Sequence, residues 1–147
     1  MTQNMTGGCL CGRIRYSARI DGTDAALCHC RMCRHSSGAF AAAVVQAKPA
    51  AVSWEREPDS YKSSPIAERL FCRECGSPLG WRPLDGETMD LMVGSFDDPT
   101  GFVPVAHGGV ESMMDVWLDT SDLPRYRTAD VPSMVERWRM AGCDVPE

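Results

Sequence analysis

Seven of the eight cysteines in this 147-residue chain stand in three tight groups, and their thiols are the side chains best suited to chemistry. The groups are Cys9/Cys11, Cys28/Cys30/Cys33 and Cys72/Cys75. Thiolates separated by one or two residues can reach a single zinc ion from a tight turn. Disulfides are the alternative, but Cys9/Cys11 and Cys28/Cys30 cannot easily bridge internally, and a chain of this length needs no covalent staples. The spacing therefore favours metal.

Two of the groups share a turn signature, because a glycine follows each pair in Cys9-Leu10-Cys11-Gly12 and Cys72-Arg73-Glu74-Cys75-Gly76. A glycine can adopt the positive φ that such a turn often requires. Zinc in structural sites takes four ligands. We therefore expect one four-thiolate site of Cys9, Cys11, Cys72 and Cys75 that closes a loop of about sixty residues and stabilises the fold.

The third group places three thiolates, Cys28, Cys30 and Cys33, within six residues. Three protein ligands with one open position are typical of a catalytic zinc site. Cys143, His29 and His35 are the candidates for a fourth ligand that would close it. Other arrangements stay open on spacing alone: this group could share a site with Cys72 or Cys75, and four cysteines could hold an iron–sulfur cluster.

Strand patterns dominate around these groups. Ile14, Tyr16, Ala18 and Ile20 alternate with polar residues, as on a half-buried strand. Residues 70–71 and 79–81 predict two strands joined by the Cys72/Cys75 turn. Further strands are predicted at 89–93 and 113–118, whereas residues 40–45 fit either a strand or a helix. The helix expected at about 132–141 begins at Pro132 and ends before Gly142. We expect a mainly β chain that forms a single zinc-binding domain over residues 1–147.

Charge and hydropathy exclude some function classes. The chain has 15 basic and 20 acidic residues, so nothing in its overall charge attracts nucleic acid or an anionic membrane surface. No segment resembles a signal peptide, and no apolar run approaches the length of a membrane helix. We therefore expect a cytoplasmic protein without nucleic-acid or membrane partners, whose cysteines stay reduced. The sequence does not predict its oligomeric state.

Several motifs together resemble the glutathione-dependent formaldehyde-activating enzyme family, which also includes centromere-protein-V-like proteins. They are Gly8-Cys9-Leu10-Cys11-Gly12, Cys28-His29-Cys30-Arg31-Met32-Cys33-Arg34, Ser37-Gly38, Phe71-Cys72-Arg73-Glu74-Cys75-Gly76-Ser77-Pro78-Leu79, Gly94-Ser95-Phe96-Asp97-Asp98-Pro99, Trp117 and Leu123-Pro124. The resemblance covers roughly residues 5–126. It implies a mostly β fold of the Mss4-like type and two zinc ions, one structural at Cys9, Cys11, Cys72 and Cys75 and one catalytic at Cys28, Cys30 and Cys33.

The resemblance also implies a reaction, the joining of glutathione to formaldehyde as S-hydroxymethylglutathione, by a carbon–sulfur lyase named for the reverse direction. Arginines beside the cysteine ligands, Arg31, Arg34 and Arg73, could receive the carboxylates of such a thiol. His35 could bind substrate or carry a proton, although the family often has lysine there. The region from His107 to Asp115 is less typical of the family, and we assign His107 no role.

Two other function classes stay open: a zinc-stabilised binding scaffold without catalysis, and a metal- or redox-responsive protein that uses the Cys28 group as a labile thiolate site. The feature that discriminates between them and an enzyme is the fourth position of the Cys28/Cys30/Cys33 site. An open position that faces a pocket favours an enzyme, whereas a closing ligand such as Cys143 counts against one.

Overall fold

The computed structural model describes residues 1–146 as two compact units, Met1–Met114 and a second that starts at Asp115. Both groups of clustered cysteines lie in the first unit. The single domain expected over 1–147 stays a prediction, and each unit is described here by itself. Among the described residues, no helix is both long and apolar enough to cross a membrane.

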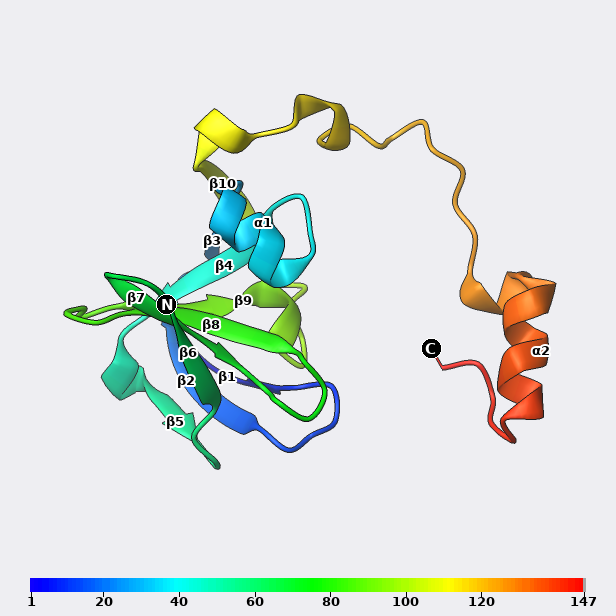
Figure 1. Cartoon of the computed structure of the whole chain (residues 1–147), viewed down its shortest axis with the longest axis horizontal. Coiled ribbons are helices and arrows are strands. Elements are labelled where there is room, and N and C mark those ends of the chain that lie inside the picture. Colours follow the sequence, from blue (N-terminus) through cyan, green and yellow to red (C-terminus); the bar gives the residue numbers. More distant parts are fainter. Residues whose placement is uncertain (147) are drawn as a thin grey trace. The chain divides into compact units, whose positions relative to one another are not determined.

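The first unit contains two β-sheets (Figure 1). The smaller is antiparallel with the order β1-β2-β5, where β1 is Thr2–Gly8, β2 is Arg15–Asp21 and β5 is Val52–Trp54. The larger has seven strands in the order β10-β3-β4-β9-β8-β7-β6. Its strands are β3 (Asp24–Cys28), β4 (Ala42–Ala47), β6 (Asp59–Ser64), β7 (Ala67–Phe71), β8 (Pro78–Pro83), β9 (Met89–Met92) and β10 (Val103–Gly108).

Apolar residues of the two sheets form the core. Tyr16, Ala18 and Ile20 of β2 are buried, as their alternation with polar residues predicts, and Ile14 just before the strand is buried with them. The larger sheet contributes four further core residues, Val45, Leu70, Leu79 and Leu91. The mainly β fold with a short C-terminal helix is therefore confirmed.

The larger sheet presents different side chains on its other face. Arg69 of β7 pairs with Trp81 of β8, and Trp81 pairs with Asp90 of β9, so the three occupy adjacent positions across the strands. Side chains alternate between faces along a strand, which separates these residues from their core neighbours Leu70 and Leu91. The short helix α1 (Arg31–Ser37) packs beside β4 (Figure 1).

Some expected elements differ from the structure. The strand predicted at 113–118 is wrong: this stretch contains the 3₁₀ turn η4 (Asp115–Trp117), which follows another turn, η3 (Val110–Ser112). The ambiguous residues 40–45 contribute to a strand, β4. The predicted strands around the Cys72/Cys75 turn are confirmed as β7 and β8, and the strand expected at 89–93 is β9, ended by η2 (Val93–Ser95). Sequence patterns had not predicted α1 or β10.

The second unit contains η5 (Thr128–Asp130) and the helix α2 (Pro132–Met140). Proline occupies the first helical turn, where its missing N–H costs nothing. Gly142 follows with a φ of 75° and donates its backbone N–H to the carbonyl of Arg139 at 3.0 Å. The helix predicted at about 132–141 is therefore confirmed.

Candidate metal centres

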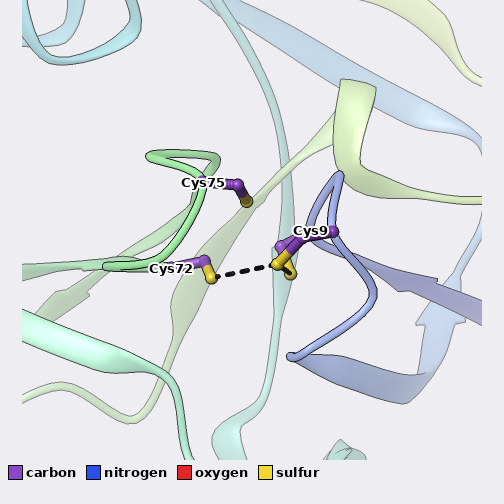
Figure 2. Close-up of side chains that lie close together, drawn as sticks. Cys9, Cys72 and Cys75 are labelled. Atoms are coloured by element: carbon purple, nitrogen blue, oxygen red, sulfur yellow. Dashed lines mark hydrogen bonds between the residues drawn. The ribbon is translucent and has the colours of Figure 1, made fainter.

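The first cysteine cluster joins two loops that lie far apart in the sequence. Cys9 and Cys11 follow β1, whereas Cys72 and Cys75 lie in the turn between β7 and β8. All four sulfurs lie within 4.8 Å of one another. Figure 2 shows the side chains of Cys72 and Cys75 on one loop and that of Cys9 on the facing loop.

The spacing of these sulfurs fits a tetrahedral zinc ion. Four sulfurs at the usual Zn–S distance of about 2.3 Å lie about 3.8 Å apart. In the structure Cys9 Sγ lies 3.6 Å from Cys11 Sγ, and Cys11 Sγ lies 3.7 Å from Cys72 Sγ. Cys9 and Cys72 are buried, and Cys75 is half-buried. The donor set and its geometry are those of a closed four-thiolate site.

Glycines shape both loops as the sequence indicates. Gly12 has a φ of 77° and donates its N–H to the carbonyl of Cys9 at 3.0 Å. Gly76 has a φ of 76° and bonds the carbonyl of Cys72 at 2.7 Å. Other residues avoid this backbone region, so glycine allows each turn to aim two sulfurs at one point.

Further hydrogen bonds hold the sulfurs in place. The backbone N–H of Ile14 donates to Cys9 Sγ at 3.2 Å. Ser77 bonds Cys75 Sγ at 3.2 Å and accepts the N–H of Leu10 at 3.0 Å, which links the two loops. Hydrogen bonds from the side chain and backbone of Ser77 lower the pKa of the Cys75 thiol to about 5. Cys75 is thereby prepared to bind a metal as thiolate.

The second cluster forms where β3 gives way to α1. Cys28 ends β3, Cys30 is the N-cap of α1, and Cys33 lies in its first turn. Their sulfurs lie within 4.8 Å of one another. Cys30 Sγ accepts the backbone N–H of Cys33 at 3.3 Å, so the helix start itself orients this sulfur.

An arginine from the larger sheet contacts this cluster. Arg69 of β7 is buried and donates from Nη2 to Cys33 Sγ at 3.5 Å. Burial raises the pKa of the Cys33 thiol to about 12, and the hydrogen bond from Arg69 opposes that rise. The guanidinium also offsets the negative charge of the three thiolates when they hold a metal cation.

Within the first unit, no fourth ligand completes the second cluster: no other His, Cys, Asp or Glu ligand atom of Met1–Met114 lies within 4.8 Å of all three sulfurs. His29 is buried, and its Nε2 lies 2.8 Å from Nδ1 of His107. His35 is exposed on α1. Cys143 is exposed in the second unit, and its role as a fourth ligand stays a prediction.

The three sulfurs open onto a cavity of about 230 Å³. Side chains of α1 and of strands β4, β7, β8 and β9 complete its lining: Met32, Ala42, Val44, Arg69, Trp81, Asp90 and Met92. The face of the sheet that carries Arg69, Trp81 and Asp90 is therefore the face beside the three-cysteine cluster. A partly open cluster beside a cavity is an arrangement in which a substrate atom can reach the metal position.

The segment after β3 is braced by β10, which runs parallel to β3. The backbone N–H of His29 donates to the carbonyl of Gly108 at 2.8 Å. Gly109 has a φ of 63°, and a Cβ placed there would lie 2.6 Å from the backbone nitrogen of Cys30. His107 also lies on β10, and its side chain bonds that of His29, which stands between the candidate ligands Cys28 and Cys30. The sequence had indicated no role for His107.

The substrate residues expected from sequence lie beside this cavity on α1 and do not line it. Arg31 and His35 are exposed, and Arg34 is half-buried with Nη1 3.6 Å from Met114 Sδ. Arg73 pairs instead with Asp59 and Glu74 at the other cluster. Substrate contacts of Arg31, Arg34 and His35 therefore stay predictions.

Sequence reasoning missed the sheet residues of the cavity, Arg69, Trp81 and Asp90. One signal was available: Arg69 and Asp90 are charged residues within short strands, and each directly precedes a core leucine, Leu70 or Leu91. Alternation then places both charged residues on the same opposite face.

The fold and the two thiolate clusters define a β-sheet protein with two metal-competent cysteine sites. A sequence model of the family described as "Glutathione-dependent formaldehyde-activating enzyme" matches residues 4–112. The chain belongs to this family.

Two further similarities agree with this assignment. An uncharacterized lyase of Schizosaccharomyces pombe is 38% identical over 82 residues, which are 55% of this chain and 59% of that protein. The chain thus matches less than two thirds of that relative. A crystal structure of a Rhodobacter sphaeroides protein has a TM-score of 0.58 at 23% identity, covering 70% of this chain and 99% of the other, and it supports the fold.

Proposed function

We propose that this chain is a zinc-dependent carbon–sulfur lyase-type enzyme that joins a small thiol, such as glutathione, to formaldehyde or another small aldehyde. Cys9, Cys11, Cys72 and Cys75 would hold a structural zinc, and Cys28, Cys30 and Cys33 a catalytic zinc. Family membership and the lyase name of the yeast relative support this proposal. The observation that carries it is the three-sulfur cluster, which lines a cavity and lacks a fourth ligand in the first unit.

The proposed reaction forms one C–S bond and consumes no oxidant or reductant. The thiol sulfur attacks the carbonyl carbon, the S–H proton is lost, and the carbonyl oxygen gains a proton to become a hydroxyl. The reverse direction breaks the C–S bond, which makes the enzyme a lyase. When bound, zinc lowers the pKa of a thiol and polarises a carbonyl.

The chain's own residues have separate tasks in this proposal. Arg69 holds Cys33 Sγ and balances the charge of the three thiolates. Apolar side chains line much of the cavity beside the reacting atoms. Arg31, Arg34 and His35 on α1 would bind the carboxylates of glutathione.

A reducing compartment would suit this chemistry, and we propose a cytoplasmic location. None of the eight cysteines forms a disulfide in the structure. Free thiols in such numbers persist where glutathione keeps them reduced.

The test compares zinc content and thiol binding in the wild type and in Cys30→Ser. Serine preserves the N-cap of α1, so the helix start should survive while one ligand is lost. We expect two zinc ions per chain to fall to one, with loss of glutathione binding in calorimetry and of catalysed S-hydroxymethylglutathione formation. Cys143→Ser is the matched control and should keep all three properties.

Two results would contradict the proposal. Glutathione binding that is unchanged in Cys30→Ser would place the thiol elsewhere. Absence of binding and turnover in a wild type that holds two zinc ions would favour the non-catalytic scaffold.

A further inference from the structure

The cavity beside Cys28, Cys30 and Cys33 is much larger than formaldehyde needs. Its volume is about 230 Å³, whereas a protein cavity of about 150 Å³ already accommodates benzene. Formaldehyde has two non-hydrogen atoms and would leave most of this space unfilled. The cavity therefore has room for a substituent on the substrate.

The walls of the cavity are mainly apolar. Ala42 and Val44 come from β4 and Met92 from β9, where Val44 and Met92 are directly paired. Trp81 of β8 adds an aromatic surface, and Met32 of α1 is about half-exposed at 49%. Burying an apolar group against such side chains is favourable by about 25 cal/mol per Å². A flexible methionine also adapts to groups of different shape.

The two charged residues of the cavity do not offer a site for an anion. Arg69 is buried, and its guanidinium is already engaged with Cys33 Sγ. Asp90 is half-buried, and burial raises the pKa of its carboxyl. A carboxylate brought beside Asp90 would meet a like charge or a poorly solvated acid. The carboxylates of glutathione therefore belong outside the cavity, on the side of α1.

We propose that this cavity is a subsite for an uncharged apolar substituent on the aldehyde, so that the enzyme accepts small branched aliphatic or aromatic aldehydes. This inference rests on the proposed function, because the same three-cysteine site carries the reaction. The carbonyl carbon lies at the sulfurs, and its substituent fills the space between Val44, Trp81 and Met92.

The kinetic test uses the zinc-loaded full chain with glutathione and two aldehydes, formaldehyde and isobutyraldehyde. Exchange NMR measures the rate at which each hemithioacetal forms. Val44→Phe fills the cavity, and we expect the ratio of kcat/KM for isobutyraldehyde to that for formaldehyde to fall by about 100-fold. Val103→Phe is the matched control, because Val103 is exposed on β10 and does not line the cavity. It should leave the ratio as in the wild type.

A binding test without turnover separates this inference from the proposed function. Benzyl alcohol, which has the shape of an aromatic aldehyde but does not react with thiols, is titrated into the zinc-loaded chain. We expect chemical-shift changes at the methyl groups of Val44 and Met92 in the wild type and in Val103→Phe. In Val44→Phe, where Met92 alone can report, the change at its methyl group should be lost, while zinc content stays at the wild-type value.

Each failure has its own signature. If formaldehyde is turned over but benzyl alcohol does not bind and Val44→Phe leaves the aldehyde ratio unchanged, the subsite is wrong and the proposed function stands. If benzyl alcohol binds at Val44 and Met92 but no aldehyde reacts, the proposed function fails and an aldehyde subsite fails with it.

Discussion

The seven clustered cysteines differ in their surroundings, and this difference supports the separate tasks that we propose for them. Cys9 and Cys72 are buried among core residues, so the four-sulfur cluster is part of the packing of the first unit. Cys28, Cys30 and Cys33 are half-buried and border a cavity. At the scale of single residues, a change in the first cluster should therefore act on stability and a change in the second on chemistry.

Replacing the buried Cys72 tests whether the four-sulfur cluster stabilises the first unit. Cys11 and Cys72, whose sulfurs are 3.7 Å apart, are separated by 61 positions in the sequence. Cross-linking a loop of this length through a metal is worth about 4 kcal/mol in the chain-entropy picture. We expect Cys72→Ser to lower the free energy of unfolding by about that amount in urea titrations. Cys33→Ser should lower the free energy of unfolding by less. An equal loss in both variants would contradict the division into a stabilising cluster and a chemical one.

Arg69 allows a second prediction at a single residue. Its guanidinium bonds Cys33 Sγ and places a positive charge beside three thiolates. Mutation of a group that contacts a metal ligand typically lowers metal affinity by about 10- to 100-fold. We expect Arg69→Met, which preserves much of the side-chain volume, to weaken zinc binding at this cluster about tenfold in competition with a chromogenic chelator. Arg82→Met, which breaks a surface ion pair with Glu68, is the control that should leave zinc affinity unchanged.

Among the elements, β10 and the turn after it have an unexpected part in positioning the second cluster. His107 and Gly108 pair with Leu27 and Cys28 of β3. Gly109 then passes so close to Cys30 that no side chain fits between them. An element from the end of the first unit thus packs against two candidate ligands, Cys28 and Cys30, from an earlier part of the chain.

This contact predicts a selective loss of metal in Gly109→Ala. The new Cβ would lie 2.6 Å from the nitrogen of Cys30, and the φ of 63° disfavours alanine as well. We expect zinc content to fall by one ion per chain, with the four-sulfur site still occupied, as measured by metal analysis.

Gly101→Ala is the matched control, since no atom lies within 4 Å of a Cβ placed there and its φ is not positive. If Gly109→Ala retained both zinc ions with wild-type affinity, β10 would have no role in holding the ligands.

At the scale of the whole molecule, both clusters and the cavity belong to the first unit, which ends at Met114. The match to the family model ends at residue 112, close to the same point. On this agreement we propose that residues 1–114 are sufficient for the fold and for both candidate metal sites.

We therefore expect a chain truncated after Met114 to fold and to hold two zinc ions. Circular dichroism and metal analysis of the truncated protein, compared with Cys143→Ser in the full chain, provide the measurement. Loss of one zinc ion in both proteins would identify Cys143 as the fourth ligand of the Cys28 cluster and would contradict an open site.

Much of this organisation could be predicted from local patterns. The alternation of Tyr16, Ala18 and Ile20 predicts a half-buried strand because side chains of a strand alternate between faces. The glycines at 12 and 76 predict turns with positive φ, and the structure confirms both. The helix α2 was predictable from Pro132 and Gly142, which act at its two ends. These signals work because each depends on neighbours in the sequence.

Other features depend on neighbours in space. Residues 113–118 have the composition of a strand, but no edge of the sheet is paired with them, so they form turns instead. The environment of His29 comes from His107, 78 positions away, and no short-range pattern reveals that contact. The cavity likewise depends on strand register, which brings Arg69, Trp81 and Asp90 to one face of the sheet.

The sequence by itself determined the ligand chemistry, since thiol spacing and the flanking glycines indicate which cysteines can reach a metal and which turns they form. Only the tertiary structure decided the surroundings of each cysteine cluster. Four sulfurs from two distant loops meet at the edge of the core, whereas three sulfurs border a cavity that six separate elements line. The physical reason is that coordination geometry is local, while burial and open space depend on how the strands pair.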